Sequence, residues 1–369
     1  MSLSRFVTRL FVPLLLFVNL PLFAAPASAA PGDLDPTFGT GGIVITRIFR
    51  YETASAMAIQ SDGKVVVVGY STDDEEGCCE KFTLRRYTPS GALDTTFGSG
   101  GQVTTSIGAG ADVAYAVAIQ SDGKIVVAGS RPSANRGSNF ALVRYRPTGA
   151  LDTTFGSRGK VTTDFGISDD VAYAIVIQPD GKIAVGGYRQ VGSNFDFALA
   201  RYGPSGALDP TFGSGGKVIT PIGTGFDAAH ALAIQPDGKI VAGGAGAYDF
   251  AMARYTPTGA LDPTFGSGGK VTTDISPFGG VAVGMALQPD GKIVLAGRAF
   301  TVSVVEGFAL ARYAPKGELD PTFGSGGTVT TSSPTGGSSG ARGVAIQSDG
   351  KIVAAGSGGD GFMVARYLG

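Results

Sequence analysis

The sequence is built from one unit that occurs six times, and this repetition limits the possible folds more than any other feature. The string Leu-Asp-[Pro/Thr]-Thr-Phe-Gly begins at residues 34, 93, 151, 208, 261 and 319. A second string, Gln-[Ser/Pro]-Asp-Gly-Lys, begins at residues 60, 120, 178, 235, 288 and 347, and an Arg-Tyr pair follows each copy of it. Three strings in a fixed order predict one structural unit that stacks against copies of itself.

Each unit predicts four short antiparallel strands, called A, B, C and D below. In the second complete unit, an Asp-Gly turn at residues 122–123 separates two apolar runs, which is a strong short-range signal for a hairpin. Strand B is apolar on both faces, as expected between neighbouring sheets, whereas strand D alternates and is predicted to be outermost. The four predicted strands of this unit are 113–120, 124–129, 140–145 and 160–163.

The composition and the two ends of the chain narrow the architecture further. Glycine accounts for 59 of 369 residues, and because each glycine inside a helix costs about 1 kcal/mol relative to alanine, a mostly helical protein is excluded. The repeats begin with a D strand at residues 42–47 and end with A, B and C strands up to Tyr367. An open stack gains nothing from this match. We therefore predict an all-β, six-bladed β-propeller with four antiparallel strands per blade, its ring closed by the N-terminal strand that completes the last blade.

Residues 1–29 have the pattern of a secretory signal peptide. Arg5 and Arg9 precede an apolar stretch at residues 10–25, and a small-residue Ala-Ser-Ala site follows at residues 27–29. The apolar stretch is too short, and too broken by proline and asparagine, to span about 30 Å of hydrocarbon. We expect cleavage before Ala30, a single propeller domain over residues 30–369 with no membrane span, and a secreted or periplasmic location in a bacterium.

Charge and rare residues exclude several classes of function. The formal net charge of −1 provides no electrostatic footprint for nucleic acid. One histidine and two cysteines leave little for a His-based metal site, a Ser-His-Asp enzyme or a disulfide scaffold. We expect no cofactor and no metal, a monomer, and an extracellular protein or glycan of unknown identity as the partner.

The repeated strings resemble a known family. The strings L-D-x-T-F-G-x-G-G, A-x-A-I-Q-x-D-G-K-I and F-A-L-A-R-Y are similar to those of the delta-sixty repeat family of secreted and surface bacterial proteins, and the resemblance covers residues 34–367. This resemblance implies a β-propeller and an extracytoplasmic setting. It implies no established activity, so no catalytic residue is carried over.

The residues that recur in every unit are interpreted as structural, because a catalytic site needs one unique group of side chains. The Asp of the first string is expected to cap its own turn, as Asp before Pro or Thr does in Asx turns. The following Phe is expected to fill the gap between blades, and the Arg of each Arg-Tyr pair to hold a loop carboxylate in a fork-shaped pair. The Phe residues are Phe38, Phe97, Phe155, Phe212, Phe265 and Phe323.

The single histidine, His230, stands where sister units have Tyr115 and Tyr173. A histidine without a visible base, acid or metal partner is more often a packing residue than a catalytic one. We therefore expect His230 to pack.

One loop carries both cysteines and an acidic run. Cys78 and Cys79 are adjacent, so they either close a strained vicinal disulfide or stay reduced at a loop tip. Some quinone-dependent propeller dehydrogenases have such a pair, but their docking repeats carry tryptophan, which this chain lacks. The acidic run at residues 73–76 does not space its ligands as a calcium loop does, so a solvated loop is expected.

Ligand contacts are expected on one face of the propeller. The A–B and C–D turns lie on one side, the repeated face, and the B–C loops and D–A links lie on the other, the variable face. Loops on a rigid scaffold are where binding residues concentrate. The candidate ligand-binding residues are Asp73, Glu76, Arg131, Arg136, Arg189, Phe195, Tyr248 and Phe300.

Two functions from different classes remain open. The first is a secreted, non-catalytic scaffold that binds a protein or glycan. The alternative is a secreted hydrolase or lyase that uses carboxylates of the variable face, with Glu306, Asp169 and Asp170 as candidates. Two carboxylates about 5–9 Å apart at a channel mouth would favour glycoside chemistry, whereas an aromatic-rimmed face would favour binding. A role as a spacer is also left open.

Overall fold

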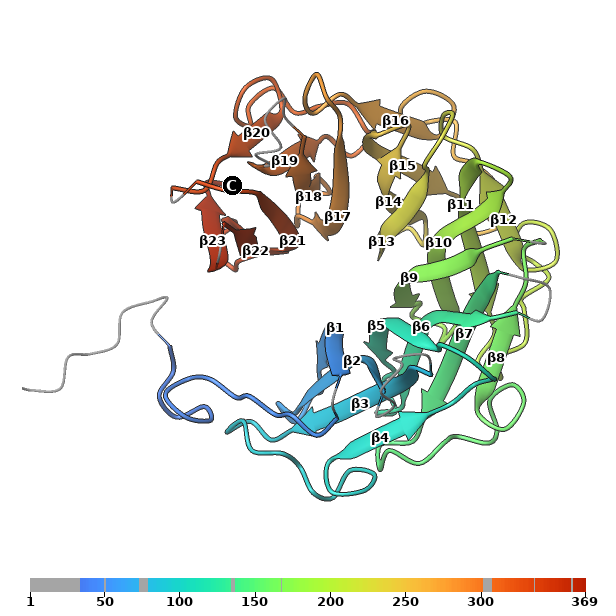
Figure 1. Cartoon of the computed structure of the whole chain (residues 1–369). Coiled ribbons are helices and arrows are strands. Elements are labelled where there is room, and N and C mark those ends of the chain that lie inside the picture. Colours follow the sequence, from blue (N-terminus) through green and yellow to red (C-terminus); the bar gives the residue numbers. More distant parts are fainter. Residues whose placement is uncertain are drawn as a thin grey trace, which may run out of the picture.

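The computed structural model is an arc of six β-sheets (Figure 1). It describes residues 34–49, 51–72, 79–133, 137–166, 168–300, 307–334, 336–359 and 361–369. Five sheets have four strands and the last has three. This confirms the all-β, six-bladed fold and four antiparallel strands in five of the six blades. Across these described ranges there is no helix able to cross a membrane.

Each sheet is made of consecutive strands of the chain. The first three sheets comprise β1 (Tyr51–Ile59), β2 (Val65–Thr72), β3 (Lys81–Tyr87) and β4 (Gln102–Thr105); β5 (Val113–Ile119), β6 (Ile125–Pro132), β7 (Ser138–Tyr145) and β8 (Lys160–Thr163); and β9 (Asp170–Ile177), β10 (Ile183–Val191), β11 (Asn194–Tyr202) and β12 (Lys217–Thr220). The last three comprise β13 (Ala228–Ile234), β14 (Ile240–Gly246), β15 (Asp249–Tyr255) and β16 (Lys270–Thr273); β17 (Gly280–Leu287), β18 (Ile293–Ala299), β19 (Gly307–Tyr313) and β20 (Thr328–Thr331); and β21 (Ser339–Ile346), β22 (Ile352–Gly358) and β23 (Gly361–Tyr367). In the four-stranded sheets the first strand lies nearest the centre of the arc and the fourth on its rim, so the D strands are outermost as predicted (Figure 1).

The A–B turns form as the Asp-Gly signal predicts. In the first blade the Gln60 amide donates to the Lys64 carbonyl at 2.8 Å, and the Gly63 amide donates to the Gln60 carbonyl at 2.9 Å. Gly63 has a φ of 79°, which glycine adopts without a steric penalty. The Asp62 carboxylate accepts the Lys64 amide at 3.2 Å and completes the turn. Contacts between residues close in sequence therefore define this hairpin turn.

Five apolar cores hold the arc together, and each core lies between two neighbouring sheets. Strands B and C supply both faces, so that Val66 of β2 packs towards the second sheet while Val126 and Val127 of β6 pack in opposite directions. The Phe of the first string fills these cores, as predicted, at five of six positions. Phe97, Phe155, Phe212 and Phe265 are 0% exposed and Phe323 is 4% exposed.

The repeated Arg and Asp form the expected structural contact, with one difference. The Arg201 Nε lies 2.9 Å from Oδ2 of Asp209, while another guanidinium nitrogen donates to the Pro257 carbonyl in the next blade. The guanidinium also covers the Phe212 ring at 4.5 Å. The predicted fork onto one carboxylate was therefore wrong in detail, because the second arm of the fork is used to link two blades.

Closure of the ring by the N-terminal strand was also wrong in this structure. The last sheet ends at β23, which pairs only with β22, and residues 42–47 form no strand with residues 362–367. Figure 1 shows an opening between this sheet and β1. Interiors are packed like organic crystals, so five packed cores set the angle between blades. At that angle the two ends of the arc stay apart.

Candidate functional site

Each innermost strand contains one β-bulge at the same place. The bulge is visible as a register shift against the second strand, for example between Ala172 and Ala174 of β9. A bulge leaves one residue unpaired and re-aims its side chain, which is why bulges often lie next to active sites. The bulge residues of the six blades are Ser55, Tyr115, Tyr173, His230, Val283 and Arg342.

A glycine on the second strand makes each bulge possible. A Cβ atom on Gly187 of β10 would lie 1.8 Å from the Val171 carbonyl oxygen, a distance that no side chain tolerates. Every blade has a glycine in this position with the same kind of close approach. They are Gly69, Gly129, Gly187, Gly244, Gly297 and Gly356. The repeat thus encodes the bulge, while the residue carried on the bulge varies.

Three consecutive bulge residues form a row of rings across three blades. The ring centroids of Tyr115 and Tyr173 are 5.1 Å apart with an interplanar angle of 71°. Tyr173 stacks on His230 at 4.7 Å with an angle of 29°. All three side chains are only partly buried. The row therefore presents ring surface on the inner side of β5, β9 and β13.

Three further rings extend this row towards the variable face. Tyr188 of β10 lies 5.8 Å from Tyr173, and Phe195 lies 5.2 Å from Tyr188. Phe226, in the link that precedes β13, lies 5.2 Å from Phe195 and 6.4 Å from His230. We call the six rings the aromatic cluster. It comprises Tyr115, Tyr173, Tyr188, Phe195, Phe226 and His230.

Burial sets the protonation of the cluster. Burial raises the pKa of Tyr188 to about 12, with the nearby Asp169 adding to the rise. Burial also raises the pKa of Tyr173, and the neighbouring Tyr188 adds to the rise. Burial, together with the charge of Arg298, lowers the pKa of His230 to about 4. The cluster is therefore uncharged at neutral pH, and within the described residues Nε2 of His230 is buried without a hydrogen-bond partner.

Three buried carboxylates near the cluster hold backbone amides. Asp170 is 0% exposed and accepts the Phe165 amide at 2.6 Å, which holds the link between β8 and β9. Asp112 and Asp227 do the same in the neighbouring blades. Of the three carboxylates considered for a hydrolase, Asp170 is thus a buried cap. Glu306 lies outside the described residues.

Five of the eight predicted ligand-binding residues lie in the described part of the chain. Phe195 belongs to the aromatic cluster, and its neighbour Asp196 forms an ion pair of 3.3 Å with Arg189. Phe300 lies under the Arg298 guanidinium at 5.5 Å. Asp73, Glu76 and Arg136 lie outside the described residues.

Arg131 and Tyr248 are not members of the cluster, although the Tyr248 ring lies beside Gly225, the residue that precedes Phe226. The Arg131 Nε donates to the Pro132 carbonyl at 3.2 Å, so the side chain lies along its own strand end. Tyr248 sits at a turn with a φ of 71° and is 61% exposed. Of the adjacent cysteines, Cys79 is exposed and Cys78 is outside the described ranges. In the part of the chain that is described, no group of three or more His, Cys, Asp or Glu side chains could hold a metal ion.

Sequence reasoning missed most of the aromatic cluster. Tyr115, Tyr173 and His230 were compared as equivalent positions, and His230 was expected to pack, which agrees with its stacking on Tyr173. The signal that could have found the cluster is the bulge position itself, which is Ser, Tyr, Tyr, His, Val and Arg in successive units. A position that varies inside an otherwise fixed repeat indicates that the structure of the unit does not require one particular side chain there.

The fold and the repeated contact between the Arg and the Asp of each unit define a β-propeller repeat protein. Five segments of the chain match the family model described as "Domain of unknown function (DUF5122) beta-propeller", at residues 60–97, 120–155, 178–212, 235–265 and 288–323. The match confirms the propeller class expected from the resemblance to delta-sixty repeats and carries no activity. No curated protein matches the sequence.

Solved structures resemble the fold at low identity. A glucose dehydrogenase is 12% identical with a TM-score of 0.48, and the match covers 86% of this chain and 99% of that one. A putative gluconolactonase is 11% identical with a TM-score of 0.45, covering 86% and 89%. Sqt1 from Chaetomium thermophilum, bound to the N-terminus of ribosomal protein L10, is 15% identical with a TM-score of 0.48, covering 85% and 80%. At these values we draw nothing about function from them.

Proposed function

We propose that this protein is a binding protein whose aromatic cluster receives the ring of a sugar, on a propeller that serves as a rigid scaffold. The observation that carries the proposal is the row formed by Tyr115, Tyr173 and His230. It lies on three neighbouring blades at the residues that the bulges free from pairing. A glycan is thus favoured over a protein partner.

The chemistry of the cluster fits a sugar better than an ionic ligand. A sugar ring has an apolar C–H face, which packs on an aromatic ring, and hydroxyl groups on its edge, which need hydrogen-bond partners when buried. The cluster offers both, since the ring faces are uncharged and the hydroxyls of its three tyrosines lie among them. A few placed polar groups in an apolar site are the usual pattern of small-molecule recognition.

The test is a glycan array with the purified protein, followed by calorimetric titration of any glycan that binds. Tyr173→Ala removes the central ring and is expected to weaken binding by roughly thirtyfold, as loss of a central aromatic contact does. Phe278→Ala is the matched control, because Phe278 is 51% exposed in the link before β17 and lies outside the cluster. Absence of any bound glycan, or equal affinity in Tyr173→Ala, would refute the proposal.

We further propose that the protein acts outside the cytoplasm, with residues 1–29 removed and residues 30–369 forming the mature domain. The Ala-Ser-Ala site supports this proposal. Mass spectrometry of the exported protein should find Ala30 as the first residue. Retention of residue 5 or residue 9 in that protein would contradict it.

A further inference from the structure

Most of the exposed large apolar side chains lie at the two ends of the arc. Among the described residues, ten of the fourteen exposed large apolar side chains lie there. Single exposed apolar residues are common, but a contiguous group marks an interaction surface. The ten are Leu34, Ile43, Ile45, Ile48, Tyr51, Met57 and Ile59 at one end, and Phe362, Val364 and Leu368 at the other.

The N-terminal segment, residues 34–47, lies where the fourth strand of a preceding blade would lie. The Gly39 amide donates to the Ser90 carbonyl at 2.7 Å. This is the contact that Gly98 makes with Thr148, at 2.8 Å, between the first and second blades. The Arg85 guanidinium also donates to the Thr46 carbonyl at 3.2 Å. The segment is thus docked on the first blade as an outermost strand without the three inner strands of its own sheet.

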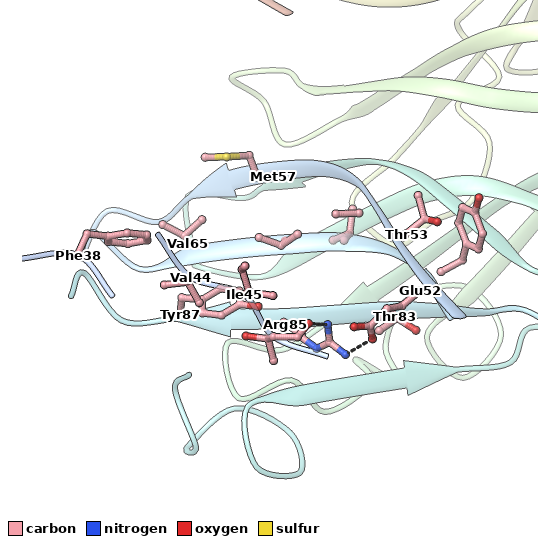
Figure 2. Close-up of a pocket in the computed structure, with 16 residues that line it drawn as sticks. Phe38, Val44, Ile45, Glu52, Thr53, Met57, Val65, Thr83, Arg85 and Tyr87 are labelled. Carbon is pink, nitrogen blue, oxygen red and sulfur yellow. Dashed lines mark hydrogen bonds and ion pairs between the residues drawn. The ribbon is translucent and has the colours of Figure 1, made fainter. Parts of the chain in front are cut away.

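A groove marks the place of those missing strands. It has a volume of about 490 Å³ and lies on the face of the first sheet that looks away from the second (Figure 2). Val44, Met57 and Val65 line it, with Glu52 and Arg85 paired at its far side (Figure 2). In the following blades the equivalent face is covered by the preceding sheet. The groove therefore has the character of an inter-blade core with one side absent.

The last sheet has the three inner strands that the N-terminal segment lacks, and it has no fourth strand. Phe362 of β23 is 101% exposed and Val364 is 68% exposed, whereas the equivalent Phe82 and Leu84 of β3 are 0% exposed. Those two pair with Thr105 and Val103 of a fourth strand, which β23 lacks.

The charges at the two ends match as well. The five counterparts of Arg366 each pair with the Asp of a first string. Within the described residues Arg366 has no such carboxylate. Asp35, the remaining Asp of this kind, is exposed and hydrogen-bonds Thr37. Each end therefore holds one half of the same ion pair.

We propose that two copies of this chain join head to tail, with residues 43–46 of one copy pairing with β23 of the other as its fourth strand. The register of the other blades places Thr46 opposite Phe362 and Val44 opposite Val364, and it brings Asp35 to Arg366. The joint completes the last sheet and fills the groove at once.

A second copy fits better than the chain's own other end. Bringing the two ends of one chain together would change the angles at the packed cores between the blades, and packed cores resist such deformation. The covalent connection between the two ends of one chain raises their effective concentration only if the geometry of the chain lets them meet. A separate copy arrives as a rigid body and needs no bending. Because the joint is heterologous, each added copy leaves one end open, so chains of copies are expected.

Disulfide trapping distinguishes the two arrangements. Facing Cα atoms in antiparallel strands are about 4.5–5.5 Å apart, which is within disulfide reach. Two differently tagged proteins are prepared with Cys78 and Cys79 replaced by serine, one with Val44→Cys and the other with Val364→Cys. Mild oxidation of the mixture should give a species that carries both tags. The control replaces Val364→Cys by Val191→Cys, which is also exposed but lies at a loop end, and should give none.

The remaining outcomes overturn the proposal. If a single chain that carries both Val44→Cys and Val364→Cys forms its disulfide without any increase in mass, the chain pairs with itself. If neither design cross-links, the two ends do not meet at all.

Light scattering provides an independent measurement. Val364→Lys places a charge on an exposed position, so the blades should stay folded, with unchanged circular dichroism, while the assembled species is lost. Ile219→Lys, on the rim strand β12 and also exposed, should leave the assembly intact. A wild-type protein that is a monomer at all concentrations, or an assembly that survives Val364→Lys, contradicts the head-to-tail joint.

Discussion

The hydroxyl of Tyr202 and the hydroxyl of Thr163 lie 2.7 Å apart, both buried, and they join the third sheet to the rim strand of the second. The same contact occurs between the other neighbouring blades. The pairs are Tyr145 with Thr105, Tyr255 with Thr220, Tyr313 with Thr273, and Tyr367 with Thr331. The Tyr of five of the six Arg-Tyr pairs therefore joins its sheet to the preceding one.

Tyr202→Phe should destabilise the protein by about 1 kcal/mol, because it leaves the Thr163 hydroxyl buried without its partner. Urea denaturation measures the change as a lower midpoint. Tyr248→Phe, at a tyrosine that is 61% exposed, is the control and should leave the midpoint unchanged. Equal midpoints for Tyr202→Phe and wild type would show that the hydrogen bond contributes nothing.

Arg201→Ala should destabilise the protein by about 3 kcal/mol, since it leaves Asp209 as a buried charge without its partner. Both side chains of this ion pair are less than one-tenth exposed. The expected result is a clear fall in the melting temperature. Arg146→Ala, at an exposed arginine, controls for the loss of a positive charge. A melting temperature equal to that of wild type would contradict the structural role of the ion pair between Arg201 and Asp209.

Asp170→Asn should change how stability depends on pH. Burial raises the pKa of Asp170 to about 7, whereas the unfolded chain titrates near the ordinary value of about 3.9. Between these values the folded protein keeps a proton that the unfolded chain has lost, so the free energy of unfolding falls as pH rises from about 4 to 7. Asparagine still accepts the Phe165 amide and does not ionise. The stability of Asp170→Asn relative to wild type should therefore increase across this window, and a constant difference would disprove the assignment.

Gly187→Ala should destabilise the protein by at least about 2 kcal/mol, because the new Cβ meets the Val171 carbonyl oxygen and the strands must move apart. The move should also displace Tyr173, which the bulge aims. Near-ultraviolet circular dichroism reports the tyrosine environment, and thermal unfolding reports stability. Gly166→Ala is the control, since a Cβ there meets nothing within 4 Å. An unchanged spectrum would mean that the glycine does not hold the bulge.

Much of the blade could be predicted because its signals are local. The Asp-Gly turn at residues 122–123, the apolar B strand and the Asp cap are each set by residues close in sequence. The predicted strands 113–120 and 160–163 match β5 and β8 to within one residue. The role of Arg201 was predicted only in part, because its second contact is with Pro257, which lies in another blade.

The sequence by itself determined the number of blades, the order of strands in the unit and the contact between the repeated Arg and Asp, since the unit is written six times and these features depend on residues close in sequence. Only the tertiary structure decided which side chains the bulges bring together and whether the ends of the arc meet. Tyr115, Tyr173 and His230 are more than fifty residues apart from one to the next, and only the stacking of blades makes them neighbours. Closure likewise depends on the angle at five packed cores, a sum of many small contacts that no single residue encodes.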